Sequence, residues 1–281
     1  MEAWREGFHF PADITLRTSP LVEAWLDLRW QLQPGSQEGL FLDPQFPLAL
    51  GTFYQSVRER FGYQEPLKAS TAPLEFLPHV VRYRFRPAPD EWPLLQLGPG
   101  VATVNFTRPP YSWAEFKEAS LYLRAKLTDS YETGLRPDRI SLQYRNAVPC
   151  SYSSGGLLLF LRSRLNTTIE LPPHIPGPVG IPDVPVNMDM AFTYNLGRPR
   201  GKGNIQFITG TKRNEPEGRE EIGTEHLLFE LRVMSQEDEV PDYTDQSQFE
   251  DWLEAAHAVI HEWFFSLIAG PLFDEYRSLQ E

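Results

Sequence analysis

The stretch Val22–Leu32, VEAWLDLRWQL, decides the fold class, because its residues sort onto two faces when the chain is extended. One face is apolar throughout and carries Val22, Ala24, Leu26, Leu28, Trp30 and Leu32. The other face carries the polar residues Glu23, Asp27, Arg29 and Gln31. A period of two residues predicts a β-strand whose apolar face lies on a core. The rest of the chain must therefore supply a layer that covers this face.

The segments that follow predict such a layer and further strands. Phe46–Phe61 places its large apolar residues at helical spacing, and Gly62 provides a stop after the last turn. A strand is expected over Val81–Phe85. Leu94–Phe106 is expected to form a hairpin around its Gly-Pro-Gly turn.

A second helix is expected to run to about Tyr131. Ser112 and Glu115 have the spacing of a capping box, in which the serine accepts a hydrogen bond from the third amide and the glutamate reaches back. The stretch 132–138, ETGLRPD, contains glycine and proline and is expected to end this helix.

The second part of the chain repeats this order. Residues 140–148 alternate as a strand, and residues 156–165 are apolar enough for a short helix. Three more strands are expected at about 186–196, 204–212 and 226–234.

The last long helix is expected to begin at a second capping box, Ser247–Glu250, and to end at Gly270 and Pro271. At 100° per residue, its apolar residues form one stripe. The residues predicted to be buried in this stripe are Phe249, Trp252, Leu253, Ala256, Ile260, Trp263, Phe264 and Leu267.

Each half of the chain therefore reads strand, helix, antiparallel strands, long helix. The halves are 1–131 and 139–281, with 132–138 as a linker. We predict an α+β protein of two similar halves, with helices packed on antiparallel sheet. The similarity is inferred from the order of elements, because few residues are identical between the halves.

Composition excludes several classes of protein. The chain has 281 residues, 41% of them hydrophobic and 13% aromatic, which excludes disorder as its main state. It has 26 Lys and Arg against 38 Asp and Glu, a net charge of −12. That charge argues against a general binder of nucleic acid or anionic membranes, because both need a positive surface field. A local basic patch is still compatible with it.

Cysteine content and hydropathy predict the compartment. A single cysteine excludes an internal disulfide, and the first residues, MEAWREGFHF, lack a basic segment followed by an apolar one. No apolar run approaches the ~18 residues of a membrane span. We therefore expect a cytoplasmic protein that does not enter the membrane.

Several short segments carry a resemblance to a known family. They are Pro20–Ala24 leading into Leu28–Trp30, the hairpin LQLGPGVATVNF with Tyr111 and WAEFK after it, RISLQYRN at Arg139–Asn146, and WLEAAHAVIHEWFFSLI. From about residue 18 to 276 the chain resembles a sporadically distributed prokaryotic family of conserved hypothetical proteins of comparable length.

The resemblance implies membership and no mechanism, because no activity, cofactor or catalytic residue is established for that family. Where its third motif commonly reads Arg-Tyr-Ile-Asn-Arg-Ile, this chain has Gln143–Val148, so its basic residues are shifted. The patchy distribution implies a partner-dependent accessory role in a mobile or defence-associated system.

The last helix carries the most specific candidate for chemistry. Glu250, Glu254, His257 and His261 run along the edge of its apolar stripe. The Glu254-x-x-His257 spacing is used by carboxylate metal sites in helical bundles, so Glu254, His257 and His261 are candidate ligands of a metal-dependent hydrolase. A transition metal needs ligands that converge from several directions, and no second helix supplies such a motif. We therefore predict that this edge is structural and holds no metal.

Two basic segments could contact a ligand or polyanion. Arg82, Arg84 and Arg86 share one face of the predicted 81–85 strand, and the 197–204 segment adds three more positive charges. The six candidate contact residues are Arg82, Arg84, Arg86, Arg198, Arg200 and Lys202. If the two segments were neighbours, they would form a positive patch on an acidic protein. A solvated sheet face also favours arginine, because its long stem covers apolar surface.

The preferred hypothesis is a non-enzymatic, cytoplasmic binding or interaction module without a cofactor. Its paired halves would form a cleft for a protein partner or a small ligand, and no catalytic motif in the chain fits its context. Two alternatives stay open. One is a nucleic-acid-associated accessory protein that uses the basic residues, and the other is the metal-dependent hydrolase.

Overall fold

The predicted first strand is the centre of the sheet. β1 (Leu21–Trp30) buries Ala24, Leu26, Leu28 and Trp30, as its alternation predicts. The prediction is wrong at its two ends, because Val22 is 41% exposed and Leu32 lies beyond the last residue of the strand. The computed structural model describes residues 16, 18–35, 39–73, 76–107, 111–132, 134–152, 156–171, 185, 187–212 and 224–277.

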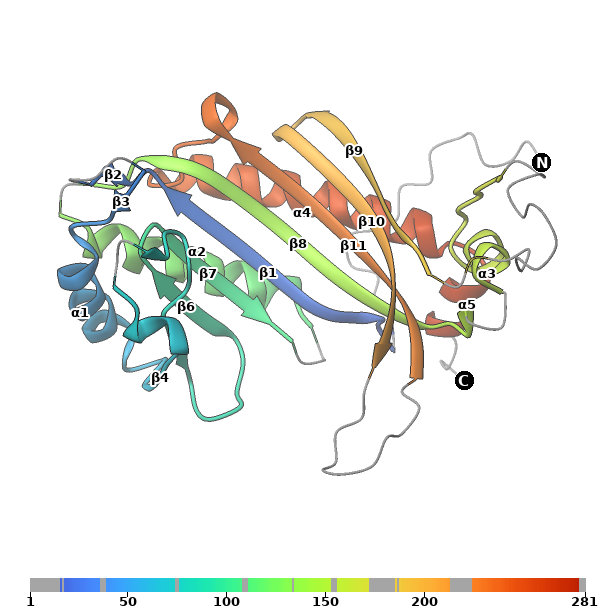
Figure 1. Ribbon diagram of the computed structural model, residues 1–281, viewed down its shortest axis with the longest axis horizontal. Helices are drawn as coiled ribbons and strands as arrows, with labels where there is room; N and C mark the ends of the chain where they lie inside the picture. The colour runs from blue at the N-terminus through green and yellow to red at the C-terminus, as the bar shows by residue number, and fades with distance from the viewer. Residues whose placement is uncertain are drawn as a thin grey trace.

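Nine strands of the described chain form one antiparallel sheet in the order β4-β5-β6-β7-β1-β8-β11-β10-β9 (Figure 1). Besides β1 they are β4 (Tyr63–Pro66), β5 (Tyr83–Arg86), β6 (Leu94–Gly98), β7 (Val101–Phe106), β8 (Pro137–Pro149), β9 (Asp189–Gly197), β10 (Arg200–Lys212) and β11 (Thr224–Gln236). A separate pair is formed by β2 (Gln33–Pro34) and β3 (Phe41–Leu42).

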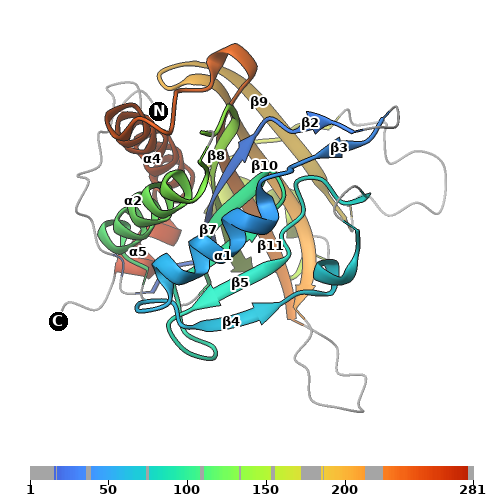
Figure 2. The ribbon, with the colours of Figure 1, turned by 90° about the vertical axis from the view of Figure 1, so that its left-hand side faces the viewer.

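Three long helices cover one face of this sheet (Figures 1 and 2). They are α1 (Phe46–Val57), α2 (Trp113–Ser130) and α4 (Gln246–Ile268). The smaller helices are α3 (Leu157–Arg164), α5 (Pro271–Arg277), η1 (Lys68–Thr71) and η4 (Glu237–Glu239). The fold is therefore mixed α+β, as predicted.

The core lies between the helices and the sheet. In register across the sheet, Leu26 of β1 faces Val104 of β7 on one side and Leu142 of β8 on the other, and all three are fully buried. Val233 of β11 continues this row beneath α4. Burial of branched side chains against helices is the main stabilising term of such a layer.

The two halves share this sheet through the β1–β8 pair. Outward from that pair, the first half continues with β7, β6 and β5, and the second half with β11, β10 and β9. Strand β8 begins at Pro137, so pairing starts inside the expected linker 132–138. The similarity of the two halves stays a prediction.

The structure agrees with the predicted N-terminal cap of α2 but not with that of α4. Ser112 accepts a hydrogen bond from the Glu115 amide, as the first capping box requires. At α4, however, the cap is Asp245, whose carboxylate accepts from the Gln248 amide at 2.9 Å, so the second predicted capping box is wrong. Ser247 instead donates its hydroxyl proton to Asp245.

The buried stripe of α4 agrees with the prediction only as far as Ile260. Beyond it, Phe265 and Ile268 are buried, whereas Trp263 and Leu267 are half-buried. The last turns of α4 pack on α5, where Phe273 lies 6.0 Å from the Phe265 ring. A second packing surface therefore rotates the buried side of the helix at this end.

The other face of the sheet carries no described helix other than η1. This helix belongs to the 67–82 segment, of which residues 67–73 and 76–82 are described, and these lie over the end of the sheet near β6. That approach requires glycine at position 98, because a Cβ there would lie 2.1 Å from the Val80 carbonyl oxygen. Within the described chain, no helix combines the length and apolarity needed to cross a bilayer.

Candidate functional site

A cavity of about 420 Å³ lies between α4, the start of α2 and one end of the sheet. We call it the α4 cavity. Its lining residues are Leu16, Ser19, Leu21, Tyr111, Ser112, Trp113, Tyr144, Asn146, His257, Ile260, His261, Phe264 and Phe265. None of these residues is Asp, Glu, Lys or Arg, so the described wall is aromatic and polar but carries no permanent charge.

The helix caps and the sheet register place the aromatic wall. Trp113 is the first residue of α2, after the Ser112 cap, and its indole stacks on the His257 imidazole with ring centroids 3.7 Å apart. Tyr111 and Tyr144 share a hydrogen bond through their hydroxyl groups. His261 lies one turn after His257 on α4, with its ring 5.8 Å from that of His257.

Burial shifts the pKa values of the titratable groups of this wall further from neutral pH, in the direction that favours the uncharged forms. It lowers the pKa of His257 to about 3, with a smaller contribution from neighbouring His261, and it also lowers the pKa of His261. Burial raises the pKa of both Tyr111 and Tyr144. At pH 7 the cavity therefore presents neutral imidazoles and protonated phenols.

Two buried polar atoms of the cavity wall have no hydrogen-bond partner among the described residues. Asn146 donates its Nδ2 proton to the Phe229 carbonyl at 3.3 Å, which leaves its Oδ1 without a donor. Nε2 of His261 is the second such atom. A buried polar group without a partner costs about 1–3 kcal/mol. Both atoms lie behind the cavity surface, since Asn146 is 0% exposed, so a ligand that pairs them also has to shift a side chain of the wall.

Glu254, the third candidate metal ligand, lies outside the α4 cavity. Its carboxylate is 2.8 Å from Lys117 of α2, and Glu250 is 2.6 Å from the same ammonium. These ion pairs raise the pKa of Lys117, chiefly through its hydrogen bond to Glu250. Among the described residues, no group of three His, Cys, Asp or Glu side chains is placed to hold a metal ion. The structure thus brings His257 and His261 together and sets Glu254 apart.

The three arginines of the 81–86 segment do not form an exposed patch. Arg82 is only 2% exposed, and its guanidinium donates to the carbonyls of Ala72 and Pro73 where the 67–82 segment folds over it. Arg86 is also buried and lies 3.5 Å from Glu65. The prediction of a shared solvent-facing side is therefore wrong, because the 67–82 segment covers Arg82, whereas Glu65 and the Trp92 ring pack against Arg86.

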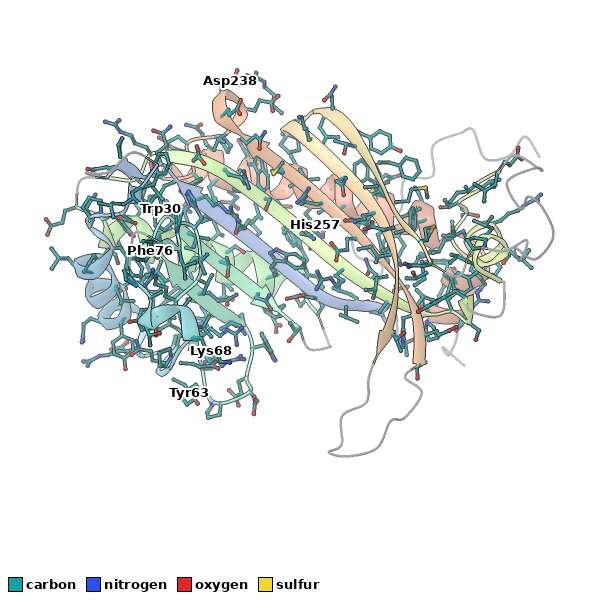
Figure 3. All side chains as sticks on the ribbon, in the orientation of Figure 1. Trp30, Tyr63, Lys68, Phe76, Asp238 and His257 are labelled. Carbon is teal, nitrogen blue, oxygen red and sulfur yellow. The ribbon has the colours of Figure 1, made fainter. Side chains whose placement is uncertain are left out.

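The second basic segment is remote from the first. Arg198 and Arg200 lie at the β9–β10 turn, where Arg200 approaches Asp238 of η4. From β5 to β10 there are six inter-strand steps, about 29 Å along the sheet at ~4.8 Å per step. Figure 3 shows Asp238 and Tyr63, which pairs with Arg86, at opposite sides of the molecule. The prediction that Arg198, Arg200 and Lys202 form one positive patch with the 81–86 arginines is therefore wrong. Contact of a polyanion with Arg198, Arg200 and Lys202 alone stays a prediction.

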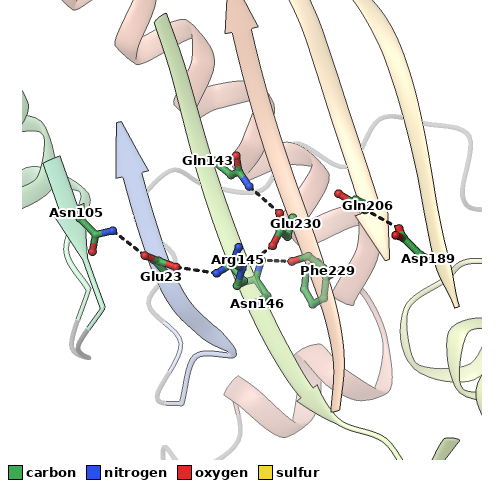
Figure 4. Close-up of polar contacts among 9 residues, drawn as sticks. All are labelled: Glu23, Asn105, Gln143, Arg145, Asn146, Asp189, Gln206, Phe229 and Glu230. Atoms are coloured by element: carbon green, nitrogen blue, oxygen red, sulfur yellow. Dashed lines mark hydrogen bonds and ion pairs between the residues drawn. The ribbon is translucent and has the colours of Figure 1, made fainter. Parts of the chain in front are cut away.

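The face without helices carries a hydrogen-bonded row of charged side chains (Figure 4). Arg145 lies 3.0 Å from Glu23 and also pairs with Glu230. Gln143 donates to Glu230, and Asn105 donates to Glu23, each at 2.7 Å. Because Glu23 and Glu230 neutralise its charge, Arg145 of the RISLQYRN motif does not create a positive surface.

Sequence reasoning missed Tyr111, Tyr144 and Asn146 as site residues. A signal for Asn146 was present, because it occupies a core-facing position between Tyr144 and Val148 in an otherwise apolar alternation. A polar residue at such a position needs a partner. The hydroxyl contact between Tyr111 and Tyr144 joins residues 33 positions apart, and no local pattern encodes it.

The chain matches no protein-family model and no curated protein. The resemblance to the sporadically distributed prokaryotic family therefore stays a prediction.

Proposed function

We propose that the protein is a non-enzymatic binding module that holds a small, uncharged, planar ligand in the α4 cavity. The observation that carries the proposal is the pair of buried, unpartnered atoms, Asn146 Oδ1 and His261 Nε2, in a cavity of about 420 Å³ whose described lining has no charged residue. Cavities of this size and character are typical of small-molecule sites.

The lining chemistry defines the ligand class. Trp113, His257 and Phe264 provide flat surfaces for stacking, which favours an aromatic or other planar molecule. Asn146 Oδ1 accepts a hydrogen bond, so the ligand should present an N–H or O–H group to it. Among the described residues, no lining cation is available for a carboxylate or phosphate, which would lose its hydration on entry.

The protonation states support binding over catalysis. General acid–base catalysis works best with a group whose pKa is near the operating pH. Burial lowers the pKa of His257 to about 3 and raises the pKa of Tyr111 and Tyr144 above the usual value for a phenol. These groups are therefore suited to fixed hydrogen bonding and stacking.

An accessory role in the cytoplasm fits this proposal. It follows from the resemblance to a patchily distributed family, and the buried, free Cys150 fits a reducing compartment. The nucleic-acid alternative loses the joint basic patch on which it rested, and the hydrolase alternative loses Glu254 from its ligand set.

Titration with 2-naphthol tests the proposal, because this probe is planar, neutral and carries one hydroxyl group. It should raise the thermal unfolding temperature of the wild type, whereas the anion 2-naphthoate should not. His261→Phe replaces the imidazole with another aromatic ring that lacks Nε2, so it should weaken 2-naphthol binding by about 3- to 10-fold. The same change should leave the ligand-free protein at least as stable, because a buried unpaired atom is lost.

His226→Phe is the matched control, because His226 lies on β11 and is absent from the α4 cavity lining. It should leave the affinity for 2-naphthol unchanged. Equal affinity for 2-naphthol and 2-naphthoate would contradict the proposed ligand class. A large loss of stability in His261→Phe, with unchanged binding, would show that the histidine has a structural role instead.

A further inference from the structure

The helix layer stops short of one edge of the sheet. Tyr194 of β9, Gly203 of β10 and Val233 of β11 are in register on the face that carries α4. Val233 is fully buried under the helix, but Tyr194 is 47% exposed and Phe192, two residues earlier on the same face, is 39% exposed. These two large aromatic side chains are thus left uncovered on β9, the edge strand of the sheet.

A groove of about 740 Å³ runs between this uncovered face and α4. We call it the β9 groove. Its apolar lining consists of Leu196, Ala255, Ala258, Val259 and Trp263. Trp263 lies flush on Gly203, where a Cβ would come within 2.2 Å of the indole, and its ring is 5.5 Å from that of Tyr194. The small Ala255 and Ala258 side chains let another backbone approach α4 closely.

The charge around the β9 groove is negative. Asp251, Glu254 and Glu262 line it, against one guanidinium from Arg198, and Glu254 is also paired with Lys117 of α2. The chain from residue 236 to 254, which leads into α4, contains eight acidic residues and no basic one. An occupant with apolar side chains and flanking cations would match both features.

We infer that the β9 groove docks an amphipathic helix of a partner protein, with Lys or Arg flanking its apolar stripe. A helix laid beside α4 continues the existing layer and buries Phe192 and Tyr194. A strand added to the edge of β9 would leave both aromatic rings on the surface. A second copy of this chain would bring the same acidic rim against itself.

A dye-labelled helical peptide of about 20 residues, built from Leu, Ala and Lys with Leu at i, i+3 and i+4 spacing, is a suitable probe. Fluorescence anisotropy should show binding to the wild type that weakens with salt. The double variant Phe192→Ser, Tyr194→Ser should weaken binding at least about tenfold. The matched control is Leu48→Ser, an 80% exposed position on α1, which should change nothing.

Charge variants test the polarity of the occupant. Asp251→Lys should weaken binding several-fold, whereas Asp129→Lys on the exposed side of α2 should have little effect. Equal binding of a Leu-Ala-Glu peptide, or an unchanged affinity in the double variant, would overturn the inference. The inference would also be overturned if sedimentation showed that the wild type is a dimer and the double variant a monomer. Binding of 2-naphthol should be the same in all these variants, so the two proposals fail separately.

Discussion

The imidazole of His257 lies parallel to the indole of Trp113, with an angle of 10° between the ring planes and 3.7 Å between their centroids. The first residue of α2 is thereby fixed to the middle of α4. The contact also removes the imidazole from water, which is the main reason for its low pKa.

This burial predicts a pH dependence of stability. The pKa of His257 is about 3 in the folded protein and ~6.5 in an unfolded chain, so between these values the unfolded state binds more protons. The free energy of unfolding should therefore fall as pH is lowered through this window. The contribution of His257 approaches about 1.4 kcal/mol per pH unit.

Urea unfolding of His257→Phe at several pH values between about 7 and 4 measures this contribution. The variant should lose less stability on acidification than the wild type, whereas His226→Phe should follow the wild type. A wild-type slope in His257→Phe would show that the imidazole is protonated in the folded protein.

Asp43 is predicted to be a major stabilising residue. One oxygen of its buried carboxylate accepts hydrogen bonds from the Trp30 indole, the Gly100 amide and the Tyr131 hydroxyl, at 3.0, 3.1 and 2.9 Å. Asp43→Ala leaves three buried donors without a partner, so it should cost about 3–5 kcal/mol in urea unfolding. Tyr131→Phe removes one donor only and should cost less. A cost equal to that of the surface change Asp129→Ala on α2 would contradict this assignment.

The rotation of the buried stripe at the end of α4 can be checked with two adjacent residues. Ile268 is fully buried and Leu267 is half-buried. Ile268→Ala should therefore lower the free energy of unfolding by about 2–5 kcal/mol, and Leu267→Ala by clearly less. If Leu267→Ala cost more free energy of unfolding than Ile268→Ala in chemical denaturation, the buried stripe predicted from periodicity would be correct at this end of α4.

Gly203 and Trp263 should be strongly coupled. An added methyl group at position 203 would lie 2.2 Å from the indole, so Gly203→Ala should cost roughly 1–3 kcal/mol by displacing Trp263. In a Trp263→Leu background the same substitution should cost little. A double-mutant cycle measures the difference, and additive effects would show that the two residues do not touch.

Arg82 should be structural, unlike Arg84. Arg82→Ser removes a buried guanidinium that holds the carbonyls of Ala72 and Pro73, so it should cost about 3 kcal/mol. The side chain of Arg84 is 34% exposed, and Arg84→Ser should have a small effect. Thermal unfolding of the two single variants checks this, and equal melting temperatures would contradict it.

The sequence by itself determined the local elements. Alternation over Val22–Leu32 predicted β1 and its buried face, and the Ser112 cap predicted the start of α2. These features are set by neighbours within a few residues, through backbone hydrogen bonding and the period of the apolar pattern. The α+β class follows from them, because each apolar face must be covered by another element.

Only the tertiary structure decided which elements meet. The order of strands separates β5 from the β9–β10 turn, and the folded 67–82 segment buries Arg82; neither follows from residue spacing. The α4 cavity joins Tyr111 from the segment before α2, Asn146 from β8 and His261 from α4. Contacts of this kind depend on where α4 crosses the sheet, and the summed packing of the whole core fixes that crossing, whereas periodicity reports only which side of an element is buried.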